Sequence, residues 1–220
     1  MKIRNGFVTN SSSSSFILTK NSSKLTEMTV ESVFGLIQKL YGQYEKKYRD
    51  VLKRVIKDAG QADFYEVFKE KYGFENMYKK DGWFTRTYGV DVFDLTTYQR
   101  AMQSFKKWKS CKNYAEYVKR CTVVSGDYTY VYPFEIFDYH TTEEPSKNYT
   151  LTETVGWYDW SNNPDEDADY DVVEDTDDAS IREKLIKLGD VGIHSECGYI
   201  PDEIVDKLSE LSVHFCNHMG

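Results

Sequence analysis

Proline is missing from the first 132 residues of this 220-residue chain. Because proline interrupts helices, its absence leaves the first half free to form long ones. The chain also lacks a run of about eighteen apolar residues, which excludes a typical membrane-spanning helix. No long apolar stretch follows the basic residues near the N-terminus, so we expect no secretory signal and a cytoplasmic location.

Common catalytic motifs are absent as well. The sequence contains no G-x-S-x-G, Walker A, G-x-G-x-x-G or H-E-x-x-H pattern. Its four cysteines form no C-x-x-C pair, which is typical of reduced thiols in a cytoplasm. A cysteine–histidine enzyme that uses Cys197 or Cys216 stays open, because such partners meet only in the fold. We favour a protein that is not an enzyme.

Helical patterns dominate the first half. Apolar residues between Val30 and Ile56 recur every three or four positions, which predicts one amphipathic helix that ends before Gly60. Residues 81–94 are predicted as a short hairpin or an irregular aromatic loop. Capping-box spacings predict three further helix starts: Asp63, Thr96 and Asn113.

The pattern changes after Cys121. Aromatic and β-branched residues predict strands at 122–124, 128–137 and 149–158. An acidic loop over 161–179 follows. Two C-terminal helices are then predicted, the first from Ser180 to Gly189 and the second from Pro201. The second helix has this apolar face: Ile204, Leu208, Leu211 and Phe215.

These elements predict an α+β fold with a helical N-terminal half, a small antiparallel sheet, an acidic loop and two C-terminal helices. We divide the chain into an N-terminal hairpin and serine-rich segment (1–25), a mainly helical basic region (26–120) and an acidic α+β region (121–220). The last two regions form either separate domains or one.

The net charge of −8 is distributed unevenly along the chain, because residues 39–120 carry +8 and residues 121–220 carry −18. Such a division indicates a polar binding surface or attraction between the two halves.

The N-terminus combines an Asn5-Gly6 hairpin signal with five serines, Ser11 to Ser15, followed by Phe16. The serines fit a flexible loop, a docked extended strand or a site of modification. This opening resembles the R-x-G-F-V-[S/T]-N-S-S-S-S-S-F start of uncharacterised proteins from large tailed phages and gut bacteria. The resemblance covers about the first eighteen residues. It implies a phage or mobile-element origin and no particular chemistry.

The acidic segment is the main candidate binding surface. Asp167 could begin a calcium loop, but Val172 stands where an EF-hand needs glycine. A solvated, self-repelling loop is another interpretation. A third is mimicry of a phosphate backbone, in which carboxylates and aromatics occupy a basic groove. The residues assigned to partner binding are Trp157, Tyr158, Trp160, Asp165, Glu166, Asp167, Asp169, Asp171, Glu174, Asp175, Asp177 and Asp178.

Zinc is the one cofactor that the sequence suggests. If the C-terminus is helical, His214 and His218 lie one turn apart, and with His194 and Cys197 they could complete a tetrahedral site. Surface histidines and buried thiols are the alternative.

The basic region interleaves lysines with aromatic residues, as single-strand-binding grooves do. Because the aromatics fall at helical spacing, we expect core packing instead, with lysines at the edges. The residues concerned are Tyr44, Tyr48, Phe105 and Trp108.

The leading hypothesis is a phage or mobile-element protein that inhibits a host or defence complex in the manner of an anti-CRISPR. Its acidic surface would compete for a nucleic-acid groove, and the partner would be a protein complex. Direct nucleic-acid binding is less favoured, because the net charge is negative, and no membrane partner is expected. One alternative is a virion or assembly component; another is a zinc protein or enzyme that uses the C-terminal cluster.

Overall fold

The computed structural model describes residues 13–59, 82, 84–125, 128–141, 178–196 and 200–218. The chain divides into two compact units. We call residues 1–35 and 112–220 the sheet unit, and residues 36–111 the hairpin unit. The described elements confirm the predicted α+β class.

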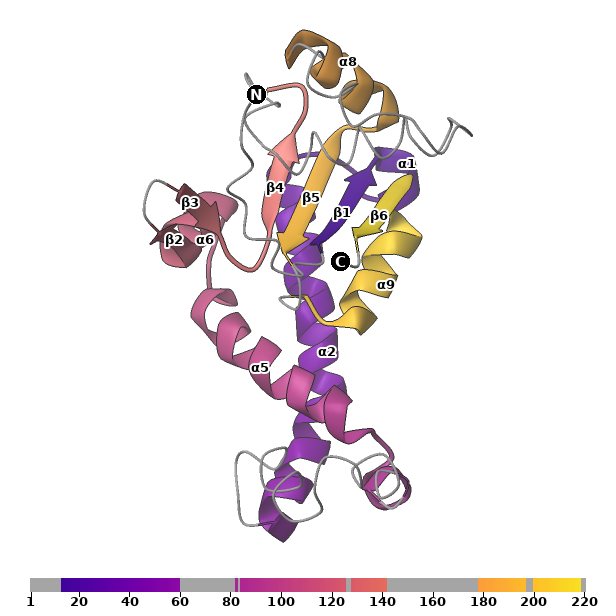
Figure 1. The fold of residues 1–220 in the computed structure, drawn as a ribbon, viewed down its shortest axis with the longest axis vertical. Coiled ribbons are helices and arrows are strands. Elements are labelled where there is room, and N and C mark those ends of the chain that lie inside the picture. Colours follow the sequence, from indigo (N-terminus) through magenta and orange to yellow (C-terminus); the bar gives the residue numbers. More distant parts are fainter. Residues whose placement is uncertain are drawn as a thin grey trace, which may run out of the picture. The chain divides into compact units, whose positions relative to one another are not determined.

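A four-stranded antiparallel sheet forms the centre of the sheet unit (Figure 1). Its strands are β1 (Ser13–Leu18), β4 (Glu135–Asp138), β5 (Val191–Glu196) and β6 (His214–His218), in the order β4-β5-β1-β6. The N-terminal strand β1 therefore lies between two strands from the C-terminal part of the chain. Over residues 13–18, the serine run forms a docked strand and not a flexible loop.

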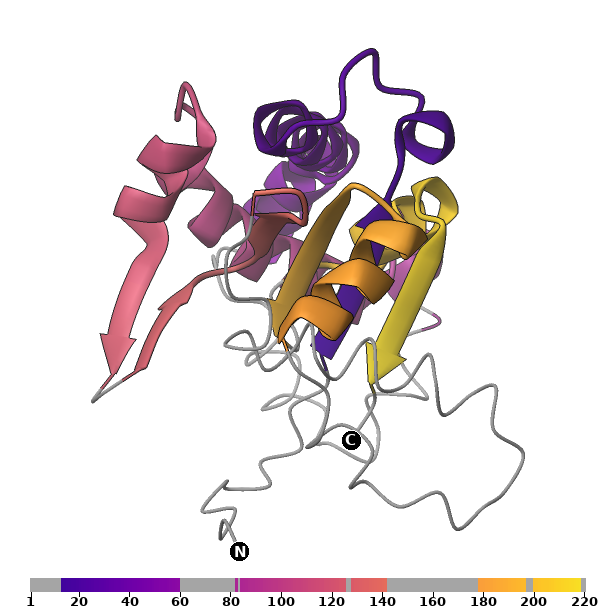
Figure 2. The same cartoon turned by 90° about the horizontal axis from the view of Figure 1, so that it is seen from above.

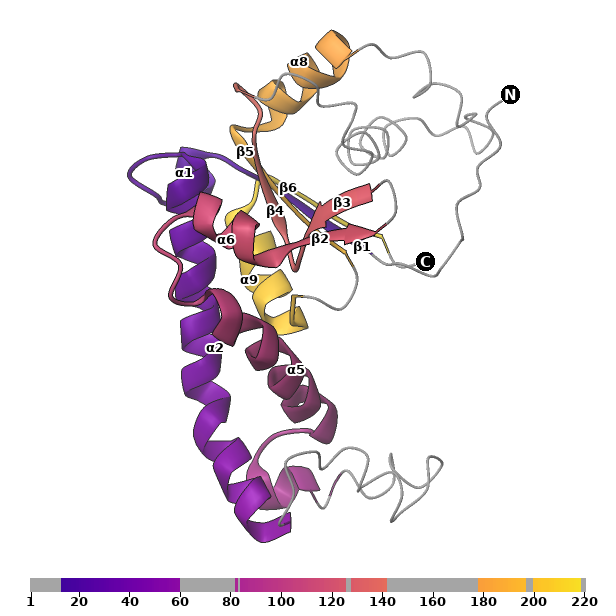
Figure 3. The same ribbon diagram turned by 90° about the vertical axis from the view of Figure 1, so that its left-hand side faces the viewer.

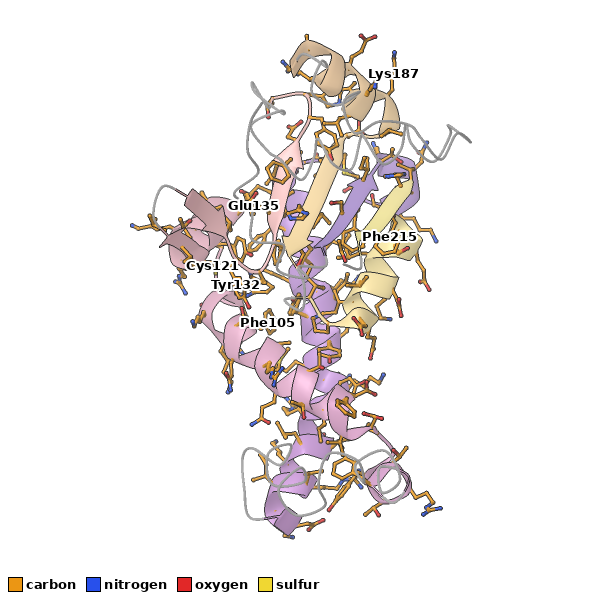
Figure 4. All side chains as sticks on the ribbon, in the orientation of Figure 1. Phe105, Cys121, Tyr132, Glu135, Lys187 and Phe215 are labelled. Atoms are coloured by element: carbon orange, nitrogen blue, oxygen red, sulfur yellow. The ribbon has the colours of Figure 1, made fainter. Side chains whose placement is uncertain are left out.

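The two faces of β1 pack against different residues. Phe16 lies in register with Ile193 and Phe215, and its ring stacks on that of Phe215 with centroids 5.0 Å apart. On the opposite face, Ile17 packs with Tyr139 and Leu185 in a buried cluster. Alternation along a strand explains this division, because successive side chains point to opposite faces. Figure 2 shows α8 lying over the sheet, and Figure 4 labels Phe215 on β6.

Among the described residues, four further helices belong to the sheet unit, and several of their ends follow local sequence signals. The Asn113 side chain accepts a hydrogen bond from the Glu116 backbone N–H, so the predicted cap is confirmed. One helix ends at Leu188, just before Gly189, and another begins after Pro201, both as predicted. These helices are α1 (Lys20–Ser23), α6 (Tyr114–Cys121), α8 (Asp178–Leu188) and α9 (Asp202–Leu211).

A separate two-stranded ribbon, β2 (Thr122–Ser125) and β3 (Tyr128–Val131), follows α6. The predicted strand over 128–137 is thus divided into β3 and β4 around Pro133, which joins neither ladder. The predicted strand at 149–158 lies outside the described residues.

The hairpin unit is built on two long helices that run side by side (Figure 3). Helix α2 (Val30–Ala59) begins in the sheet unit and continues into this one, and α5 (Val92–Trp108) follows later. Buried aromatic rings form the seam, with ring centroids 4.9 Å apart for Tyr41–Trp108 and 5.6 Å for Tyr44–Tyr98. The predicted helix from Val30 is therefore confirmed; Gly60 and Asp63 lie outside the described residues.

Four local predictions were wrong. The helix predicted to start at Ser180 begins at Asp178, so Ser180 lies inside α8. Residues 84–88 are helical, and α5 starts at Val92, where the Asp91 side chain accepts hydrogen bonds from two backbone N–H groups. Thr96 therefore lies inside a helix and not at its start. The last helix ends at Leu211, and Phe215 belongs to β6.

None of the described helices combines the length and apolarity needed to cross a membrane.

Candidate functional site

The residues predicted to bind a partner, from Trp157 to Asp177, lie outside the described residues. Asp178 begins α8, and its side chain is not described. The elements on either side are described: β4 ends at Asp138 and α8 starts at Asp178. Between them, the sequence of 142–177 carries twelve acidic residues and one lysine, a net charge of −11. Both ends of this acidic segment are therefore attached to the sheet unit.

The predicted zinc site depended on a helical C-terminus, and that premise is wrong. His214 and His218 lie on β6, where four residues span about 13 Å instead of one helical turn. His194 lies on β5, on the other side of β1. Cys197 is outside the described residues. Among the residues that are described, no group of three or more histidine, cysteine, aspartate or glutamate side chains could hold a metal ion.

The sheet instead brings Ser15 and His194 together, although 179 positions separate them. They lie opposite each other on β1 and β5, and the Ser15 Oγ is 3.2 Å from His194 Nδ1. Both side chains are buried, with 4% and 7% of their surface exposed. Glu135 is opposite His194 on β4, so the three residues form a transverse row across the sheet. Figure 4 labels Glu135 in this row.

Burial lowers the pKa of His194 to about 4, so its ring is neutral near pH 7. A neutral imidazole beside a serine hydroxyl is the arrangement of a base and a nucleophile. Here both groups are enclosed, which keeps substrates away from the hydroxyl. The Glu135 carboxylate accepts a hydrogen bond from the Val131 backbone N–H at 3.0 Å. The Ser15–His194 hydrogen bond therefore satisfies two buried polar groups and links β1 to β5, whereas the Glu135 carboxylate bonds to the backbone of β3.

Sequence reasoning named His194 as a zinc ligand and missed its partner Ser15 and its neighbour Glu135. Residues 13–18 read as three serines followed by three apolar residues, which is no alternating strand pattern, and no local signal shows which strand lies beside them.

A second candidate surface is the outer side of the hairpin unit. Four exposed lysines on α2 are separated by seven, seven and four residues, which places them within an arc of about 40° on the helix. This arc is opposite the buried seam that contains Tyr41, Tyr44 and Tyr48. We call these four residues the lysine stripe: Lys39, Lys46, Lys53 and Lys57.

The predicted role of the aromatics in this region as core residues is confirmed. Tyr44, Tyr48, Phe105 and Trp108 are all buried, so they are not exposed platforms for stacking bases.

The charge division of the sequence follows the two structural units. Residues 36–111 contain sixteen lysines and arginines and ten acidic residues, a net charge of +6. The sheet unit contains twelve basic and twenty-six acidic residues, a net charge of −14. Comparison with known proteins adds no family, since no family model, curated protein or solved structure matches this chain.

Proposed function

We propose that this chain is a phage or mobile-element protein that binds a protein complex of its bacterial host and blocks that complex, as anti-CRISPR proteins do. The acidic segment between Thr141 and Asp178 competes with nucleic acid for a basic groove of the partner. The attraction is electrostatic and falls as salt rises. The site of action is the host cytoplasm. The phage origin rests on the resemblance of the N-terminus.

The observation that carries this proposal is the concentration of negative charge. The segment 142–177 supplies −11 of the −14 of the sheet unit. Its ends are attached to β4 and α8, two elements of the same folded unit. A segment attached at both ends loses less freedom on binding than a free tail of the same length, so more of its electrostatic attraction appears as affinity.

The Ser15–His194 pair of the sheet does not support a catalytic role. Ser15 and His194 have the residue types of a nucleophile and a base, but their burial leaves no route for a substrate.

Affinity capture from host lysate tests the proposal, with two charge-matched variants compared against wild type. Both variants change the net charge from −8 to −4. The first carries asparagine at Asp165, Asp167, Asp169 and Asp171. The control carries amides at four exposed acidic residues of the described structure: Glu27, Glu183, Asp206 and Glu210.

We expect wild type and the control to capture the same complex, to release it in high salt and to lower its nucleic-acid binding. The acidic-segment variant should do none of these. Equal capture and equal inhibition by both variants would contradict the proposal.

A further inference from the structure

We propose that the lysine stripe of α2 is a second binding surface, which contacts the phosphate backbone of nucleic acid without reading its sequence. This surface is distinct from the acidic segment, so either proposal can fail without the other. The net charge of the whole chain argues against nucleic-acid binding. The division into units weakens that objection, because the hairpin unit alone carries +6.

Among the described residues, few acidic groups neutralise the positive charge of the stripe. Asp50 is the acidic residue of α2 nearest to this arc, and its carboxylate lies 3.7 Å from Lys53 Nζ and 3.6 Å from Arg49 Nε. These exposed pairs contribute little and exchange readily with other anions. Within the described part of the chain, no ion pair or hydrogen bond joins the side chains of Lys39, Lys46 or Lys57 to an acidic group.

The length of the stripe suits an extended polyanion better than a small ligand. Lys39 and Lys57 are eighteen residues apart on one unbroken helix, which corresponds to about 27 Å. A nucleic-acid duplex of that length is about eight base pairs long and presents phosphates throughout. Helix α5 adds exposed cations to the same unit at Arg100 and Lys106.

The buried seam determines what kind of recognition is available. Tyr44, Tyr48, Phe105 and Trp108 face the inside of the hairpin, so the described surface does not offer these rings to unpaired bases. Contacts from lysine to phosphate carry no sequence information. Binding should therefore depend strongly on salt and weakly on sequence.

Fluorescence anisotropy with a labelled duplex of about 16 base pairs, at about 50 mM and about 200 mM salt, tests this inference. The stripe variant replaces Lys39, Lys46 and Lys57 by glutamine. The matched control replaces Lys20, Lys112 and Lys119, three exposed lysines of the sheet unit. Both variants have a net charge of −11. Circular dichroism checks that both fold.

We expect wild type and the control to bind duplexes of unrelated sequence equally. The stripe variant should lose roughly tenfold or more in affinity at low salt, and its salt slope should fall by about three. The proposal is overturned if wild type does not bind at low salt, or if the two variants bind alike. It is also overturned if stripe-dependent binding is seen only with a peptide of residues 157–178, because the partner is then an acidic protein segment.

Discussion

The phenol of Tyr139 occupies the space that a side chain at Gly192 would need. A Cβ built on Gly192 would lie 1.9 Å from the Tyr139 Oη and 2.5 Å from its Cζ. Tyr139 follows β4 and lies in the buried cluster with Ile17 and Leu185. The absence of a side chain on β5 thus lets a large aromatic ring lie directly on the sheet.

Gly192→Ala should therefore destabilise the sheet unit by about 1–3 kcal/mol or more, because the ring has to move out of a packed core. Gly35→Ala is the control, since a Cβ there would meet nothing within 4 Å. In a helix that change should stabilise the protein by about 0.5–1 kcal/mol. Urea unfolding measures the change in the free energy of unfolding for each variant. Equal effects of the two substitutions would show that Tyr139 does not restrict this position.

Two buried tyrosines should respond differently to loss of their hydroxyls. The Tyr117 hydroxyl donates to the Phe134 carbonyl at 2.9 Å and accepts from the Phe134 N–H at 3.1 Å. The Tyr139 hydroxyl has no hydrogen-bond partner within the described structure. Tyr117→Phe should cost about 1–3 kcal/mol, whereas Tyr139→Phe should be neutral or slightly stabilising. Thermal or urea unfolding distinguishes them, and a larger loss from Tyr139→Phe would refute the assignment.

Stability should fall as the pH drops below 7, because burial lowers the pKa of His194 in the folded protein from 6.5 to about 4. Between these values the unfolded chain binds the proton and the folded protein does not, so acid favours unfolding. The free energy of unfolding should be roughly 2 kcal/mol lower at pH 5 than at pH 7. Burial also lowers the pKa of His214, which acts in the same direction.

Urea unfolding of wild type and His194→Asn at several pH values tests that dependence. His194→Asn should flatten most of the profile between pH 7 and pH 5. An unchanged slope in His194→Asn would assign the dependence to other groups.

The cap of α6 should account for a measurable part of its stability. Asn113→Ala removes the side-chain oxygen that accepts from the Glu116 N–H at 2.9 Å, and it should cost about 1 kcal/mol. Asn113→Asp keeps an acceptor at the same place and should be close to neutral. If alanine and aspartate give equal unfolding midpoints, the hydrogen bond does not stabilise the helix.

The features that could be predicted from the sequence are those with a local cause. The seam of α2 repeats every three or four residues, Asn113 caps its own helix, and Pro201 precedes a helix with acidic residues in its first turn. Each of these sequence patterns lies within one or two helical turns of the helix or helix end that it predicts. The cap at Asp91 has the same local character, but the aromatic residues around it were interpreted as a loop or hairpin.

The features that could not be predicted depend on distant partners. Ser15 and His194 are far apart in sequence, and neither local segment contains a pattern that predicts their hydrogen bond. The C-terminal strand was interpreted as helix because Phe215 continues the helical spacing of Leu208 and Leu211. Pairing with β1 outweighs the helical pattern at this end of the chain, because it stacks the ring of Phe215 on that of Phe16.

The central position of β1 has a consequence for the order of events on the ribosome. Both of its neighbours, β5 and β6, are synthesised long after it, and at about 5–20 residues per second the delay is of the order of ten seconds or more. During that time the strand has neither neighbour, and its Phe16-Ile17-Leu18 end is the kind of apolar edge that attracts other chains. The serine half of the strand is polar. Only the three apolar residues of the other half therefore favour aggregation before β5 and β6 have been synthesised.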